Sequence, residues 1–177
     1  MRISSLVKNT FCDMTPTVKI ITKAELERKI KTKKVLIDVN AVTKIFGFFA
    51  SRGNIEAVCL LQGRLCGEYL LIKDAHLCTN AKATSVHVTI PTESFAEAAA
   101  DANGNYVIGW AHSHPGFAVF MSPTDEATQK DFQALFSDAV AMVMNPFSAQ
   151  GIEFKFFRYH DGKLEKMKYD FLVSRDD

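Results

Sequence analysis

The sequence has no hydrophobic run near the roughly 18 residues of a membrane-spanning helix, and its N-terminus lacks the apolar segment of a secretory signal peptide. Its four cysteines form no CxxC pair, so no cysteine zinc knuckle is encoded. Cys59 lies in an apolar run, which is typical of a core thiol rather than half of a disulfide. These absences predict a reduced, cytoplasmic protein without a membrane partner.

The chain also lacks a strong excess of charge of either sign, because its formal net charge is only +1. A nucleic-acid-binding domain normally carries a basic face or stripe, so no nucleic-acid partner is expected. One basic cluster, within residues 28–34, is typical of a solvated helix end or linker. With 177 residues, of which 47% are hydrophobic and 23% charged, the chain suits one compact domain with a sizeable core.

Residues 1–34 show the weakest pattern. Residues 17–22 are compatible with a short strand, and residues 23–34 are charged and helix-forming. No linker rich in proline, glycine or serine separates this segment from the rest of the chain. We therefore interpret residues 1–34 as an N-terminal extension, whose role the sequence leaves open, and residues 35–177 as the main domain.

From Val35 onward, strand patterns alternate with helix patterns. Strands are predicted at residues 35–37, 57–61, 69–72, 86–90, 106–111, 140–144 and 152–159. Helices are predicted around Val42–Phe49, capped by Asp38 or Asn40, and at residues 92–100 and 124–136, and Asp161-Gly162 is a hairpin signal. The order predicts a mixed α/β domain with one layer of sheet and flanking helices.

Two of these segments carry more detailed expectations. Residues 57–61 and 69–72 should be adjacent antiparallel strands, joined by the glycine-bearing connection at residues 63–67. In the alternating segment 86–90, Val86, Val88 and Ile90 should face the core together.

Four residues with metal-site chemistry lie close together in the sequence: His112, His114, Ser122 and Asp125. The two histidines end a predicted strand at a spacing of i and i+2, so both imidazoles should lie on the same face. A catalytic zinc ion takes three protein ligands and keeps one position for water. The pattern therefore favours a metal site over two satisfied core histidines.

The segment Ser122-Pro123-Thr124-Asp125 also has the pattern of a helix start, with serine at the N-cap, proline at N1 and an acid at N3. The two interpretations are compatible, because a helix N-terminus holds its side chains rigidly. Asp125 would complete a set of two histidines and one aspartate. Ser122 could donate a hydrogen bond to the oxyanion that forms when a carbonyl is attacked.

Such a site also needs a proton acceptor that is not a metal ligand. Glu56 is the candidate, because it stands at the start of the apolar run 57–61, where a carboxylate is otherwise unfavourable. A solvent-exposed position at a strand edge is the alternative. Glu68, Glu93 and Glu97 are competing acids at a predicted strand start or on a predicted helix.

The spacing from His112 through His114 and Ser122 to Asp125 resembles the complete JAMM (MPN+) metalloprotease motif. Residues 54–63 resemble the family's upstream segment, in which a glutamate opens a strand that ends in glycine. The resemblance covers residues 35–157, and residues 109–117 are especially similar to the deubiquitinating subunit of the proteasome lid and its archaeal homologues. It implies a cytidine-deaminase-like MPN domain with a curved mixed central sheet flanked by helices.

The resemblance implies that His112, His114 and Asp125 bind one catalytic zinc ion. It further implies that Glu56 passes a proton from the attacking water to the leaving amine, and that Ser122 steadies the tetrahedral intermediate. The implied reaction is hydrolysis of the isopeptide bond between the C-terminal glycine of ubiquitin, or a ubiquitin-like modifier, and a lysine amine. Implied partners are such conjugates, and also the proteasome or a homologous MPN protein.

Two other activities stay open: a peptidase for sulfur-carrier-type or other small-protein tails, and a non-catalytic MPN scaffold. For substrate binding, residues 79–85 resemble an insertion that in relatives pairs with the modifier's tail. We expect Thr84, Ser85 and Val86 to contact that tail, with Phe117 of the apolar loop 117–121 beside it. The alternatives are a mobile polar loop at residues 79–85 and buried packing of residues 117–121.

Overall fold

The computed structural model describes residues 34–149 and 151–173. The N-terminal extension, with its predicted strand and nearly all of its predicted helix, lies outside these residues. Lys34, the last residue of that predicted helix, instead begins the first strand. No helix in the described part of the chain is long and apolar enough to cross a membrane.

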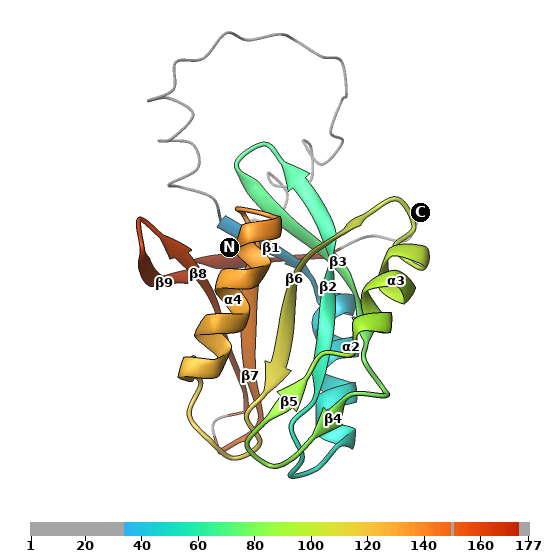
Figure 1. The fold of residues 1–177 in the computed structure, drawn as a ribbon, viewed down its shortest axis with the longest axis vertical. Coiled ribbons are helices and arrows are strands. Elements are labelled where there is room, and N and C mark those ends of the chain that lie inside the picture. Colours follow the sequence, from blue (N-terminus) through green and yellow to red (C-terminus); the bar gives the residue numbers. More distant parts are fainter. Residues whose placement is uncertain (1–33, 150, 174–177) are drawn as a thin grey trace, which may run out of the picture. The chain divides into compact units, whose positions relative to one another are not determined.

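A mixed, curled sheet forms the centre of the domain, with eight strands in the order β10-β1-β3-β2-β6-β7-β8-β9 (Figure 1). Its central strands β6 and β7 are parallel, and β2 is antiparallel to β6. In chain order the strands are β1 (Lys34–Asp38), β2 (Val58–Cys66), β3 (Tyr69–Leu77), β6 (Tyr106–Ser113), β7 (Val140–Ser148), β8 (Gly151–His160), β9 (Lys163–Met167) and β10 (Tyr169–Leu172).

Three helices and a small hairpin complete the described fold: α2 (Val39–Ser51), α3 (Thr92–Ala100), α4 (Pro123–Leu135), and the two-stranded sheet of β4 (Lys82–Ala83) and β5 (Val88–Thr89). Side chains alternate between the two faces of a strand, so the sheet has a core on each side. Helix α2 packs with Cys59 and Leu61 on one face. Helices α3 and α4 pack with Val58 and Leu60 on the other. The predicted α/β architecture, a sheet flanked by helices, is confirmed.

Local signals account for several element boundaries. The side chain of Asp38 accepts a hydrogen bond from the backbone N–H of Asn40 at 3.0 Å, so Asp38 is the N-cap of α2. Asp161 and Gly162 both have positive φ, 48° and 75°, as a tight turn between β8 and β9 requires. The predicted turn is therefore confirmed, and the strand after it was not predicted.

The structure corrects three expectations about the strands. The predicted connection at residues 63–67 is mostly strand, because β2 continues through Gly63 to Cys66. The pairing of β2 with β3 shifts register between Gln62 and Gly63, where the backbone passes close to Leu71. A Cβ atom on Gly63 would lie only 1.9 Å from the carbonyl oxygen of Leu71. Strand β5 is shorter than predicted, and Val86 precedes it with 72% of its surface exposed, so Val86 does not face the core.

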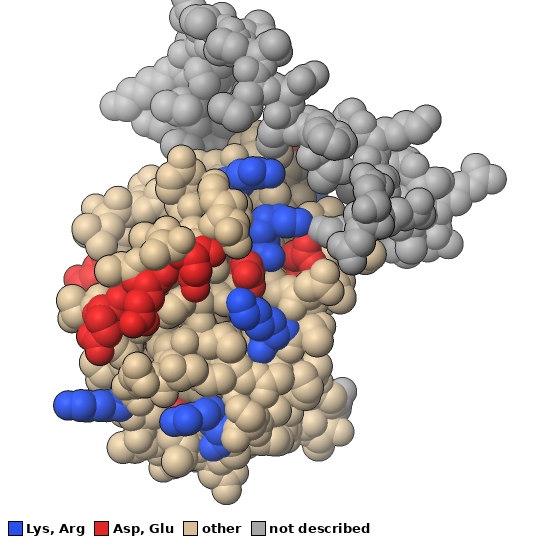
Figure 2. Space-filling view, turned by 90° about the vertical axis from the view of Figure 1, so that its right-hand side faces the viewer, with Lys and Arg blue, Asp and Glu red and all other residues tan. Residues whose placement is uncertain are grey.

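Two of the cysteines are buried in the core. Cys59 and Cys78 are free thiols, as expected for Cys59. On the face that carries α3, acidic side chains gather in a diagonal band, and basic side chains lie in separate groups beside it (Figure 2).

Candidate metal centre

The end of β6 and the residue that follows it, His114, bring the two histidines to the face of the sheet that α4 covers. His112 and His114 lie on one side of the strand, and the intervening Ser113 points to the other. The side-chain oxygen of Ser113 accepts a hydrogen bond from the backbone N–H of Ala57 at 2.9 Å, and the N–H of Ser113 donates to the carbonyl of Ala57 at 2.9 Å. These bonds tie the end of β6 to the start of β2.

Helix α4 begins beside the histidines with a complete capping box. The Ser122 side chain accepts from the Asp125 N–H at 3.3 Å, and the Asp125 carboxylate accepts from the Ser122 N–H at 2.7 Å. The predicted helix start is therefore confirmed. Because the cap holds Asp125 at the first turn, its other oxygen faces His112.

His112, His114 and Asp125 form the group of described residues that could hold a metal ion. The Nε2 atoms of the two histidines are 3.0 Å apart. Asp125 places Oδ1 3.4 Å from Nε2 of His112 and Oδ2 3.8 Å from Nε2 of His114. Three potential ligand atoms thus converge from a strand end and a helix start.

The electrostatics of this cluster favour the forms that bind metals. Burial raises the pKa of Asp125, but hydrogen bonds from His112 and Ser122 outweigh it and lower that pKa to about 2. Burial and the neighbouring His112 lower the pKa of His114 below its ordinary value. An ionised carboxylate and a neutral imidazole are therefore present at neutral pH.

Glu56 lies next to this cluster, directly before β2. Its Oε1 is 3.9 Å from Nε2 of His114, and only 6% of its surface is exposed. Burial raises its pKa from 4.5 to about 6. The alternative of a solvated strand edge is thus wrong, whereas the competing acids Glu68, Glu93 and Glu97 are exposed.

The loop between the two sets of potential ligands combines both expected roles. Val119 and Met121 are buried, while Phe117 and Phe120 are about half exposed at 53% and 51%. The Phe120 ring lies edge-on to the His114 imidazole, with centroids 5.1 Å apart. The loop therefore both packs into the core and lines the entrance to the cluster.

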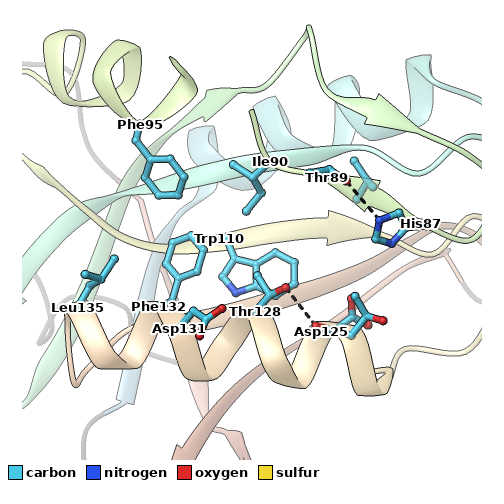
Figure 3. A pocket seen from close by; sticks show the side chains of 12 residues that line it. His87, Thr89, Ile90, Phe95, Trp110, Asp125, Thr128, Asp131, Phe132 and Leu135 are labelled. Atoms are coloured by element: carbon cyan, nitrogen blue, oxygen red, sulfur yellow. Dashed lines mark hydrogen bonds between the residues drawn. The ribbon is translucent and has the colours of Figure 1, made fainter. Parts of the chain in front are cut away.

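Two adjoining hollows lead away from the cluster. The first, of about 270 Å³, is lined by Glu56, Ser122 and Asp125 together with Val86, His87, His114, Phe117, Phe120 and Thr124. The second, of about 300 Å³, runs between β5 and α4 to Leu135 and Phe95 (Figure 3). Because both are lined by His87, Thr124 and Asp125, they form one groove, called here the α4 groove.

Only two of the four predicted substrate-binding residues line the α4 groove. Val86 and Phe117 line it. The backbone groups of Thr84 are already hydrogen-bonded within the protein. Its N–H donates to the carbonyl of His87 in the same hairpin, and its carbonyl accepts from the N–H of Glu56. Neither Thr84 nor Ser85 lines either hollow.

Sequence reasoning missed much of the groove wall, which includes His87, Ile90, Phe95, Thr128 and Leu135. Thr128 lies one turn after Thr124 on α4, and both line the groove. Thr124 is next to Asp125 in the sequence, so the i and i+4 spacing of the two threonines could have indicated that this face of α4 lines the site.

Comparisons with known proteins identify a family for this chain. The family model described as JAB1/Mov34/MPN/PAD-1 ubiquitin protease matches residues 30–138, more than half of the chain. A 26S proteasome regulatory subunit of Encephalitozoon cuniculi is 32% identical over 117 residues, which cover 62% of this chain and 40% of that protein. The ubiquitin carboxyl-terminal hydrolase of Saccharomyces cerevisiae is 51% identical over 43 residues, which cover 24% of this chain and 14% of that protein.

These alignments thus span 40% or less of the length of the two relatives. Among solved structures, the solution structure of a protein from Desulfitobacterium hafniense superposes with a TM-score of 0.65. It is 17% identical in sequence, and the match covers 79% of this chain and 94% of that one. At this identity the likeness supports the fold alone.

Proposed function

The chain belongs to the JAB1/Mov34/MPN/PAD-1 ubiquitin protease family, the JAMM/MPN+ proteins, and we propose that it is a zinc-dependent isopeptidase. Its proposed reaction is hydrolysis of the bond between the C-terminal glycine of ubiquitin, or a ubiquitin-like modifier, and a lysine amine. The observation that carries the proposal is the convergence of His112, His114 and Asp125 beside the buried carboxyl group of Glu56.

The donor atoms fit zinc in both kind and spacing. Zinc in proteins takes imidazole nitrogen and carboxylate oxygen at about 2.0–2.2 Å in a tetrahedron, which places two ligand atoms about 3.3–3.5 Å apart. The two Nε2 atoms are 3.0 Å apart, and the Asp125 oxygens lie 3.4 Å from His112 (Oδ1) and 3.8 Å from His114 (Oδ2), all close to that value. Three protein ligands leave the fourth position for water, as in a hydrolytic site.

When bound, zinc would polarise the scissile carbonyl and lower the pKa of a water molecule to near 7. The chain's own residues supply the rest of the proposed mechanism. Glu56 removes the proton from the attacking water, because its carboxyl lies beside His114 without serving as one of the three ligands. It then returns the proton to the amine that leaves, so the same carboxyl acts first as a base and then as an acid.

Ser122 is positioned to stabilise the oxyanion. Its side-chain oxygen accepts a hydrogen bond from the backbone N–H of Asp125, so the hydroxyl can donate its own proton, either to the Asp125 carboxylate or to the oxyanion once that forms. The capping box also holds the hydroxyl in place before substrate arrives. A preorganised donor of this kind stabilises the transition state more than the ground state.

The α4 groove supports an extended chain end as the substrate. Strand β5 pairs only with β4 in its small sheet, so its second edge is open to strand addition among the described elements. The groove wall offers Ile90, Phe95 and Phe132 to apolar side chains, and it leads to Asp125 (Figure 3). We propose that the modifier's tail lies along this groove, with its C-terminal residue at the metal.

The proposed partners are conjugates of such modifiers and a ubiquitin-pathway complex. The supporting observation is the similarity to a 26S proteasome regulatory subunit. No specific partner is assigned.

The test is metal content measured by mass spectrometry together with cleavage of modifier conjugates, for wild type and Glu56→Gln. One zinc per chain in both proteins, with cleavage by wild type alone, is the expected result. Zinc in both but cleavage by neither, across conjugates of several modifiers, would contradict the isopeptidase. Absence of zinc from both would remove the metal mechanism and favour a non-catalytic scaffold.

A further inference from the structure

The two histidines of the metal centre are held in different ways. A metal-binding imidazole is usually oriented by a hydrogen bond from its second ring nitrogen. His114 has such a bond, because its Nδ1 lies 3.0 Å from the carbonyl oxygen of Ala118. In the described part of the chain, the Nδ1 atom of His112 is buried and has no hydrogen-bond partner. Another contact must therefore set the orientation of the His112 ring.

That contact is the indole of Trp110. The Trp110 and His112 rings are stacked, with centroids 4.8 Å apart and planes only 12° from parallel. Phe132 of α4 lies stacked against Trp110 as well, at 6.0 Å and 21°. Trp110 is 3% exposed and His112 is 1% exposed, so the stack has little room to move.

The indole is fixed in turn by Gln129 of α4. Trp110 donates from Nε1 to Oε1 of Gln129 at 3.0 Å. The amide nitrogen of Gln129 donates to the carbonyl oxygen of Ala139 at 2.8 Å and to Oε1 of Gln133 at 3.0 Å. Gln129 is fully buried, and these bonds leave its amide one orientation.

Two successive contacts join β6 to α4: Trp110 with Gln129, and His112 with Asp125. Trp110 precedes His112 by two residues on the strand, so both lie on the same face. Gln129 follows Asp125 by four residues on the helix, one turn further along the same side. The Trp110–Gln129 bond therefore sets the strand against the helix directly behind the His112–Asp125 contact, which brings the metal ligands of the two elements together.

We propose that Trp110 and Gln129 are positioning residues of the metal centre: Gln129 orients the indole, and the indole orients His112 toward the ion. This inference rests on the metal site of the proposed function. Its test uses zinc affinity and tryptophan emission, which are measured without substrate. Trp110 is the chain's single tryptophan, so its fluorescence reports on the stack directly.

The experiment compares Gln129→Met with Gln133→Met in the full chain. Both substitutions roughly keep the side-chain volume and remove amide hydrogen bonds, because Gln133 donates to the carbonyls of Ser137 and Tyr159 from a partly buried position. Of the two glutamines, Gln129 is the one that accepts from Trp110. Zinc affinity, measured against a chelator, should fall about 10- to 100-fold in Gln129→Met, the usual cost of losing a ligand-orienting partner. Gln133→Met removes one acceptor of the Gln129 amide but leaves its bonds to Trp110 and Ala139, so it should lose much less zinc affinity than Gln129→Met.

Adding zinc to the metal-free wild type should change the Trp110 emission, since the ligand ring is stacked on the indole. Gln133→Met should keep that change and Gln129→Met should reduce it. Unchanged zinc affinity in Gln129→Met would overturn the inference, and so would an equal loss in both variants, which would indicate a general effect on α4. Failure of wild type to bind zinc would overturn the proposed function as well, so the two failures are distinguishable.

A second variant covers the case in which Gln129→Met does not fold, as judged by circular dichroism. Trp110→Phe keeps an aromatic ring in the stack and removes the indole N–H that Gln129 accepts. It should lose zinc affinity by a similar factor. Where both single variants fold, the losses in the double variant Trp110→Phe/Gln129→Met should not add, because the two residues act through one contact. Additive losses would show that the residues act independently.

Discussion

Glu56 and His114 face each other across the β2–β6 pair, with Oε1 of the glutamate 3.9 Å from Nε2 of the histidine. The antiparallel register pairs Val58 with His112, so the residues two positions outward on each strand meet at the same end of the sheet. The separation of these two residues in the sequence is therefore closed by strand pairing and not by a local motif. Four predictions concern this site and its groove.

Glu56→Gln should lower kcat about 10²- to 10⁴-fold, which is the usual contribution of a positioned proton acceptor. Zinc content should not fall, because the three proposed ligands are unaltered. The matched control is Glu68→Gln, which changes an exposed acid in the turn between β2 and β3 and should leave both quantities unchanged. Single-turnover cleavage and metal analysis would check this, and equal activity of Glu56→Gln and wild type would exclude Glu56 as the base.

Ser122→Ala should lower kcat about 10²- to 10³-fold by removing the proposed oxyanion donor. It should also cost about 1 kcal/mol of stability, because the hydroxyl is the N-cap of α4. Ser122→Asn separates the two roles, since asparagine is a good N-cap but does not place a hydroxyl at the site. Thermal unfolding should recover in Ser122→Asn while kcat stays low. Recovery of kcat together with stability would show that capping alone matters.

The pH dependence of stability should report the burial of Glu56. Its pKa in the folded protein is raised from 4.5 to about 6, so below about 4.5 the carboxyl is protonated in both states and carries no penalty. As pH rises from about 4.5 to about 6, the metal-free folded protein loses stability, by about 2 kcal/mol in all relative to that limit. Metal-free Glu56→Gln should therefore gain stability over wild type above pH 6 and not below about pH 4.5. A constant difference across this range in chemical denaturation would contradict the burial of an ionisable Glu56.

The α4 groove should be blocked by a large side chain at Thr128, which lines it. Thr128→Phe should raise KM for a modifier conjugate at least about tenfold, equivalent to about 1.4 kcal/mol of binding. Ala127→Phe adds the same ring at the neighbouring exposed position of α4 and should not change KM. Zinc content should be the same in both variants. If the two variants show equal KM values, the tail does not run along this groove.

Local patterns could be predicted because their causes lie within a few residues. The spacing of His112 and His114 places two side chains on one face of any strand. The capping box at Ser122 depends only on the first turn of α4. The alternation at residues 86–90 misled for the same reason, because it predicts a core-facing strand wherever it occurs. Val86 lies instead in the exposed hairpin over the groove, where no described element covers it.

The sequence by itself determined the set of chemical groups, the strand that carries the histidines and the helix start that carries Asp125. Only the tertiary structure decided that Glu56 is buried beside them, because its burial depends on the pairing of β2 with β6 and on the hydrogen bond from its N–H to the Thr84 carbonyl of the hairpin. The contact between Trp110 and Gln129 was likewise decided by the packing of α4 on the sheet. Neither arrangement has a local periodicity, since each depends on which distant segments share the same core.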